Sequence, residues 1–214
     1  MDNTQRMIAL LGRIRKQMNG AVAESMGTHG VNYGLNYGVS IATLREIVAQ
    51  ESKDYDFAKY LYRQQVRELK LCACHLADPA KLDTHEFPFW SRGITNAELA
   101  EELAFALLSK IYDINSLMGV WTTESNELVA YAALMAASRN ARTTSEVAFI
   151  AAEKSVKANP ASEYIAHGVV ALICHIAQND KSVPTGIPSL LDSMPDCPTK
   201  SRIVEELDWR LNFL

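Results

Sequence analysis

The sequence lacks the features that mark exported, disulfide-stabilised and membrane-spanning proteins. Only four of its 214 residues are cysteines, and their scattered positions, without a Cys-x-x-Cys pair, do not suit a disulfide framework. No run reaches the roughly 18 apolar residues that a membrane span requires. The chain also opens directly into a mixed amphipathic segment. We therefore expect a cytoplasmic protein that does not enter a membrane.

An excess of basic residues is also missing. The chain has 21 Lys and Arg residues against 25 Asp and Glu residues, for a net charge of −4. Many nucleic-acid-binding proteins carry a basic excess. DNA binding by this chain would therefore require a local patch of Lys and Arg.

What is present favours a helical protein. Apolar residues make up 48% of the chain and charged residues 21%, which is enough to fill a core and too little charge for disorder. Apolar residues recur at three- and four-residue spacing, as in the stripe Leu99, Leu103 and Leu107. No segment shows the alternation of a half-buried strand. The sequence therefore predicts an all-α fold.

Start signals and periodicity predict ten helices. Thr95 to Glu98 and Thr143 to Glu146 have the Ser/Thr-x-x-Glu pattern of a capping box. Ser40, Ser125 and the pair Asn159-Pro160 are further predicted starts. The segments rich in glycine and proline, Gly27 to Gly38 and Val183 to Pro198, are predicted loops. The predicted helices lie near 4–19, 40–50, 54–63, 65–77, 83–90, 95–112, 124–138, 144–157, 160–178 and 198–212.

The later part of the chain repeats a helix-turn-helix unit about every 35 to 40 residues, a period typical of HEAT-type solenoids. Short loops between successive helices indicate antiparallel neighbours. We expect one helical-repeat domain that spans residues 1–214.

Four segments carry a resemblance to a known family. Residues 38–47, GVSIATLREI, match a G-V-x-x-x-x-L-R-x-I helix, and residues 57–79 continue the pattern and close on L-A-D-P. Trp121 followed by NELVAYA and the segment DCPT at 196–199 match two later motifs. By these motifs the sequence resembles the HEAT-like-repeat DNA alkylation repair family, the alkylpurine DNA glycosylases. The resemblance implies a right-handed superhelix of antiparallel helix pairs that binds duplex DNA in a concave groove.

The resemblance also implies a site. The family's S-W-D-x-x-D helix matches residues 96–101, NAELAE, so its catalytic aspartate falls on Glu101, its first aspartate on Glu98 and its tryptophan on Ala97. The concave arginine falls on Tyr131 and the second ring-stacking tryptophan on Ala171. In such an enzyme the carboxylate stabilises the positive charge that develops on deoxyribose as the N-glycosidic bond breaks. We expect no metal ion and no organic cofactor.

Each acidic candidate also has a structural alternative. Glu98 stands three residues after Thr95 and could be the carboxylate of a capping box. Glu101 could be a solvated acid in a first helical turn, which the helix dipole favours. Cys72, Cys74 and His75 do not all point at one ion from a helix, so a metal site there is not favoured. His167 and His175 have no nucleophile at a recognisable spacing.

Two sets of basic residues are candidates for DNA phosphates. Arg63, Arg67 and Lys70 recur at helical spacing, and Arg139 and Arg142 flank a predicted turn. Phosphate contacts would set affinity without reading sequence. The alternative is that these residues form an ordinary solvated surface.

Two functions remain open from the sequence. The first is a DNA-binding member of the alkylation repair family, with or without N-glycosidic hydrolysis through Glu101. The second is a catalytically inactive helical-repeat module that binds a protein or structured DNA.

Overall fold

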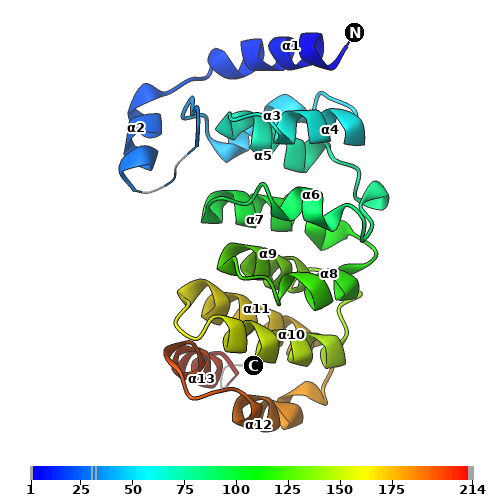
Figure 1. The fold of residues 1–214 in the computed structure, drawn as a ribbon, viewed down its shortest axis with the longest axis vertical. Helices are drawn as coiled ribbons and strands as arrows, with labels where there is room; N and C mark the ends of the chain where they lie inside the picture. Colours follow the sequence, from blue (N-terminus) through cyan, green and yellow to red (C-terminus); the bar gives the residue numbers. More distant parts are fainter. Residues whose placement is uncertain (1, 30, 32, 212–214) are drawn as a thin grey trace.

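The computed structural model describes residues 2–29, 31 and 33–211, and all regular structure in these ranges is helical. Figure 1 shows helix pairs stacked one above the other along the long axis. This confirms the predicted all-α repeat fold. None of the helices described is long and apolar enough to cross a membrane. The α-helices are α1 Asn3–Arg15, α2 Gly20–Thr28, α3 Ile41–Val48, α4 Tyr55–Tyr62, α5 Arg67–Leu76, α6 Phe87–Ser91, α7 Ala97–Ala106, α8 Ile114–Trp121, α9 Glu127–Ala137, α10 Ser145–Ala158, α11 Glu163–Asn179, α12 Val183–Ser193 and α13 Pro198–Leu211.

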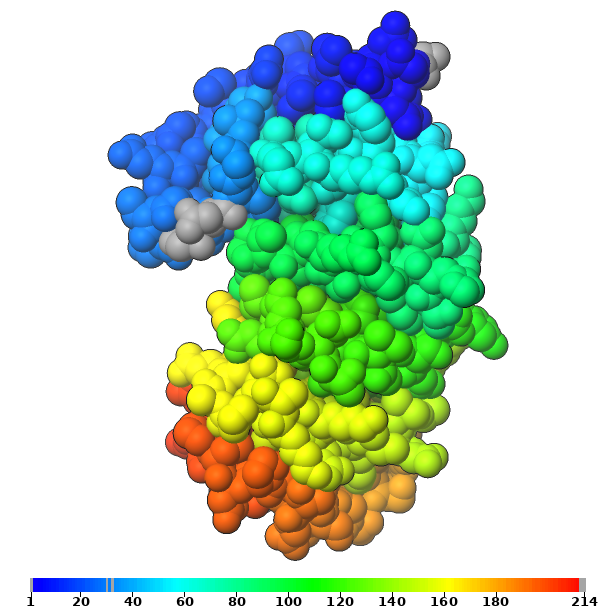
Figure 2. All heavy atoms as spheres, in the orientation of Figure 1, coloured from blue at the N-terminus to red at the C-terminus, as the bar shows by residue number. Residues whose placement is uncertain are grey.

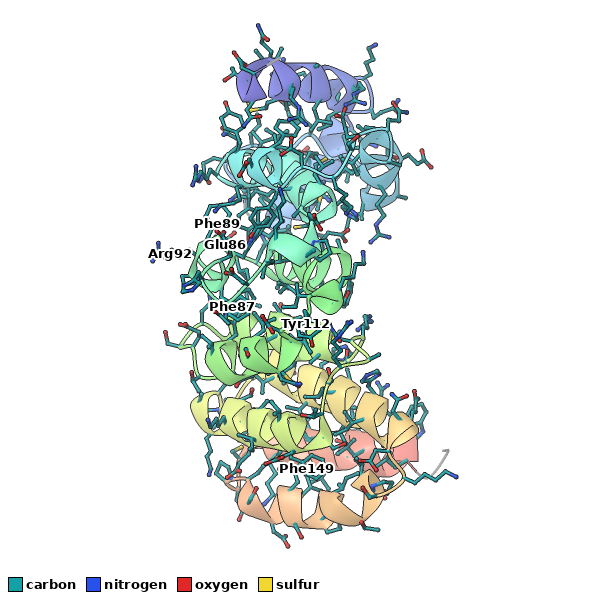
Figure 3. All side chains as sticks on the ribbon, turned by 90° about the vertical axis from the view of Figure 1, so that its right-hand side faces the viewer. Glu86, Phe87, Phe89, Arg92, Tyr112 and Phe149 are labelled. Carbon is teal, nitrogen blue, oxygen red and sulfur yellow. The ribbon has the colours of Figure 1, made fainter. Side chains whose placement is uncertain are left out.

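The helices form two layers, which Figure 3 shows side by side. In one, which we call the odd layer, α3, α5, α7, α9, α11 and α13 pack in sequence, each against the next. The even layer contains α4, α6, α8, α10 and α12. The α2 segment stands out from one side of the stack in Figure 2. Because every unit rests on the units beside it, one continuous apolar core runs between the layers.

Helix α9 is the most enclosed element of the odd layer. Every residue from Val129 to Ala137 is buried, because α9 contacts α7, α11 and two helices of the even layer. Its small residues, mostly alanines, let these neighbours approach closely. A helix that is apolar on all sides suits this central position.

The predicted helix starts were partly wrong. Ser40 is confirmed as the cap of α3, because its hydroxyl accepts a hydrogen bond from the Thr43 amide. The other caps lie downstream of the predicted residue: Asn96 instead of Thr95, Asn126 instead of Ser125, Thr144 instead of Thr143, and Ser162 instead of Asn159. At Asn96, Asn126 and Ser162 the side chain of the observed cap accepts a hydrogen bond from a backbone amide of the helix. The residue predicted to cap makes no such bond. Boundaries set by a capping contact are hard to locate among adjacent polar residues.

Three helices were missed. α12 occupies most of the predicted loop from Val183 to Pro198, because Val183, Ile187 and Leu190 are buried at helical spacing. Pro184 lies in the first turn, where no amide donor is needed. The predicted helix 4–19 ends at Arg15, and Asn19 caps a separate helix, α2. The third, α8, lies between the predicted helices 95–112 and 124–138, and the α-helix in the first of these ends at Ala106.

The loop before α3 makes a turn that requires glycine. Gly38 has a φ of +70°, and a Cβ there would lie 2.0 Å from the Asn19 carbonyl oxygen. A side chain is excluded by both the backbone conformation and the lack of space. This turn brings the amides of Tyr37 and Val39 onto the buried carboxylate of Glu68 in α5.

Candidate functional site

A pocket of about 610 Å³ opens on the odd layer across α7, α9, α11 and α13. α7, α9 and α11 contribute side chains from their first halves, and α13 contributes side chains from its middle. The lining residues that bear on its chemistry are Glu101, Glu127, Tyr131, Glu163, Tyr164, His167, Arg202 and Glu206.

Glu101 and Tyr131 meet at the wall of this pocket. The Tyr131 hydroxyl donates a 2.8 Å hydrogen bond to Glu101 Oε1. Burial, together with the Glu101 carboxylate, raises the pKa of Tyr131, so its hydroxyl stays protonated at neutral pH and keeps donating. The structure therefore brings together the two positions that the resemblance assigned to the catalytic carboxylate and the concave arginine.

Aromatic rings line the same pocket. The ring centroid of Tyr131 lies 5.3 Å from that of Tyr164 and 6.3 Å from that of His167. Ala171, the position matched to the second tryptophan, is half-buried and packs against the core instead. Sequence reasoning did not find the aromatic role of Tyr164 and His167. Their spacing could have indicated this role, because Tyr164 and His167 lie one helical turn apart and two turns and one turn before Ala171 on the same helix.

The charge around the pocket is mainly negative. Glu127, Glu163 and Glu206 join Glu101 in its lining, and Arg202 forms an ion pair with Glu163. Carboxylates beside aromatic faces attract a flat cation, because both the charges and the ring quadrupoles favour it. The pocket is therefore suited chemically to a cationic ring.

Glu98 lies elsewhere and has a different role. Its carboxylate accepts hydrogen bonds from Arg67 Nε at 2.8 Å and from the Tyr33 hydroxyl at 3.0 Å. It is absent from the lining of the pocket. The capping-box alternative was wrong because Asn96 caps α7, and Glu98 instead pairs with a buried arginine.

Arg67 and Lys70 do not form an exposed basic face. Arg67 is 2% exposed and donates to both Glu68 and Glu98, and Lys70 is 6% exposed. Burial alone would lower the pKa of Arg67, but hydrogen bonds and attraction from Glu98 and Glu68 raise it overall. Their helix, α5, is enclosed by α3, α4 and α7. Of the predicted set, only Arg63 is exposed.

Arg139 and Arg142 are exposed at the end of α9. The Arg139 guanidinium lies 4.0 Å from the ring centroid of Phe105, one helical turn beyond Glu101 on α7. Arg142 lies over the ring of Tyr112 at 4.9 Å. Both guanidinium groups remain accessible to a phosphate.

The cysteine and histidine cluster on α5 is structural. Cys72 and Cys74 are buried and free, and burial raises the pKa of the Cys72 thiol to about 12. His75 turns instead to Glu102, which also pairs with Arg45. Within the described ranges, no three His, Cys, Asp or Glu side chains are grouped to hold a metal ion.

The sequence and the structure were compared with those of known proteins. The model of the DNA alkylation repair enzyme family matches residues 10–167. A solved structure, described as a new family of proteins related to the HEAT-like repeat DNA glycosylases with affinity for branched DNA structures, has a TM-score of 0.69. It is 16% identical, and the match covers 98% of this chain and 95% of that one. No match was found among the curated proteins. Since the family model covers well over half of the sequence, the chain belongs to the DNA alkylation repair enzyme family.

Proposed function

We propose that the protein binds DNA across its odd layer and removes cationic alkylated purines through the pocket around Glu101. The observation that carries this proposal is the Glu101 carboxylate, held by Tyr131 at 2.8 Å in a pocket with two further aromatic side chains. Purines alkylated at a ring nitrogen are flat and positively charged. They match the carboxylates and rings of this pocket in both shape and charge.

The proposed reaction is hydrolysis of the N-glycosidic bond. The oxygen of a water molecule bonds to C1′ of the deoxyribose while the bond from C1′ to the base nitrogen breaks. The electron pair of that bond neutralises the departing base, and the proton lost by the water passes to Glu101 and then to solvent. The carboxylate stabilises the positive charge that develops on the sugar, and Tyr131 fixes its orientation.

Contacts to the DNA backbone are assigned to Arg139 and Arg142. Both are exposed next to the helices that carry Glu101 and Tyr131. A guanidinium group is suited to bidentate contact with phosphate. The described affinity of the structural relative for branched DNA supports including branched substrates in the binding assay.

The catalytic assignment is tested by base release. Methylated duplex DNA is incubated with the protein, and free 7-methylguanine and 3-methyladenine are quantified over time. Glu101→Gln keeps the shape of the side chain and removes its negative charge. The rate of base release should therefore fall by about 10²-fold or more. Glu124→Gln, an exposed glutamate in the turn before α9, is the matched control and should act as the wild type. An equal rate in Glu101→Gln would refute the role of this carboxylate.

The acidic pocket also supports a second candidate, an inactive module that binds a cationic segment of another protein. Four carboxylates line the pocket, and the chain as a whole carries a charge of −4. This function predicts binding of a lysine- and arginine-rich peptide that is lost in Glu101→Gln, with no base release by the wild type. Base release by the wild type would exclude an inactive module.

A further inference from the structure

A second pocket, of about 500 Å³, lies between the turn that joins α4 to α5 and the turn that joins α6 to α7. It shares no lining residue with the pocket around Glu101. Figure 3 shows two of its residues, Phe89 and Arg92, close together at the edge of the even layer. We call it the edge pocket. Its lining includes Tyr62, Arg63, Lys70, His85, Phe89 and Arg92.

The edge pocket has the opposite charge to the first one. Its lining contains two arginines, a lysine and a histidine but no carboxylate. The carboxylate of Glu86, which lies on the same segment, is already bound by Lys59 and by the Tyr55 hydroxyl. Within the described part of the chain, neither Arg63 nor Arg92 has an acidic partner within 4 Å. The positive charge of this pocket is therefore not neutralised by the protein.

Lys70 is the residue that an ordinary solvated surface does not explain. It is only 6% exposed, yet it lines the pocket. Its ammonium group donates to the Tyr62 carbonyl oxygen at 2.8 Å, its one hydrogen bond in the described ranges. An ammonium group has three protons to donate, and burying it without an anion is unfavourable. Burial accordingly lowers the pKa of Lys70.

The exposed arginines complete the site. The Arg63 guanidinium lies over the Phe89 ring at 5.2 Å, and this stacking restricts its motion while leaving its N–H groups free to donate. Arg92 reaches the same space from the end of α6. Two forked donors around a buried ammonium group form an arrangement that suits a tetrahedral oxyanion.

We propose that the edge pocket binds a phosphate group, with Arg63, Lys70 and Arg92 as its ligands. The group can belong to the 5′ end of a DNA strand or to a free phosphate, since the same donors recognise both. The proposal does not depend on the function assigned to the pocket around Glu101, because the two pockets share no residue.

The full chain is tested with inorganic phosphate as the probe. The arginine Nε–Hε resonances and the backbone amide resonances of Gln65 and Gly93, which line the pocket, are followed by NMR during a titration, with sodium chloride added at matched ionic strength as the reference. We expect saturable shifts for Arg63 and Arg92, and an affinity at least about tenfold lower in the double variant Arg63→Gln, Arg92→Gln. Both side chains are exposed, so the variant should fold. Arg15→Gln, at an exposed arginine in the last turn of α1, is the control and should bind phosphate normally.

A second arm identifies the source of the phosphate. A short single-stranded oligonucleotide is titrated with and without a 5′-phosphate. Binding at least about tenfold tighter with the 5′-phosphate would identify a strand end, and equal binding together with saturable inorganic phosphate would identify a free phosphate. Shifts that chloride reproduces, or amide shifts of Gln65 and Gly93 that are retained in the double variant, would overturn the proposal. Loss of base release in Glu101→Gln has no bearing on either result.

Discussion

Two glutamates three residues apart on α7 show how position decides the role of a carboxylate. Glu98 faces α5 and neutralises the buried Arg67, whereas Glu101 faces α9 and the pocket. A helical step of three residues keeps both on one broad side but directs them to different neighbours. The chemistry of the site therefore depends on which helix each carboxylate faces.

The carboxylate of Glu102 should make stability depend on acid pH. Burial opposes its charge, but hydrogen bonding and attraction from His75, with Arg45, lower its pKa overall. Because the folded pKa lies below the unfolded value of about 4.3, this stabilisation is present at higher pH and is lost as the pH falls below that value.

Urea unfolding across this range measures the effect. The free energy of unfolding should fall as the pH decreases, and Glu102→Gln should flatten the decrease. Glu46→Gln, on an exposed position of α3, should leave the slope unchanged. A slope unaffected by Glu102→Gln would show that this carboxylate does not contribute.

At the residue scale, the sequence predicted two residues of the candidate pocket. Glu101 and Tyr131 were identified through the family motif, and the structure brings them into contact. Tyr164 and His167 were not found, because a ring contact between adjacent helices depends on their relative rotation. Arg67 and Lys70 were misplaced because α5 is enclosed on several sides, and charged residues at helical spacing do not show which side faces water.

At the scale of single elements, the cap of α9 offers a direct comparison. Asn126 accepts a hydrogen bond from the Leu128 amide, whereas the adjacent Ser125, predicted to cap, does not. Asn126→Ala should lower the free energy of unfolding by about 1 kcal/mol. Ser125→Ala should change it by less than about 0.5 kcal/mol. Chemical denaturation of both variants measures the difference, and the reverse order would show that the helix begins one residue earlier.

Close packing of α9 against α11 should depend on Gly168. A Cβ there would lie 3.0 Å from Leu134 Cβ and 3.3 Å from Tyr131 Cδ2. Gly168→Ala should therefore destabilise the protein by about 1 to 3 kcal/mol and displace Tyr131 from Glu101.

Gly119 in α8 is the matched control, since an added Cβ there would meet no atom within 4 Å beyond its chain neighbours and the backbone of its own helix. Gly119→Ala should stabilise the protein by about 0.5 to 1 kcal/mol, because alanine is the better helix former. Thermal unfolding distinguishes the two variants. Equal changes in melting temperature would contradict the packing role of Gly168.

At the element scale, periodic apolar stripes predicted most helices well, including α10 and α11. The failures share a physical cause. α12 was hidden by its prolines, although its buried face keeps helical spacing. The break between α1 and α2 was not predicted, because an asparagine such as Asn19 can either continue one helix or cap the next. Local propensity does not decide between these outcomes when tertiary burial supplies the larger free energy.

At the scale of the whole molecule, the proposed DNA binding should depend on few phosphate contacts. Because the net charge is −4, attraction must come from local residues such as Arg139 and Arg142. In a mobility-shift titration at several salt concentrations, Arg139→Gln with Arg142→Gln should reduce the slope of log affinity against log salt by about 2. Lys16→Gln with Lys154→Gln, two exposed lysines at the end of α1 and within α10, is the control. An unchanged slope would remove these arginines from the DNA contact.

The pocket around Glu101 draws its walls from α7, α9, α11 and α13, and each of these helices packs mainly on the next. The width of the pocket therefore depends on the relative rotations of three successive helix pairs, α7 with α9, α9 with α11, and α11 with α13. A ligand that contacts both Glu101 and Arg202 would restrain all three of these helix–helix contacts at the same time. Ligand binding in the pocket should then reduce the relative motion of the helices from α7 to α13, and leave the relative motion of α1 to α5 unchanged.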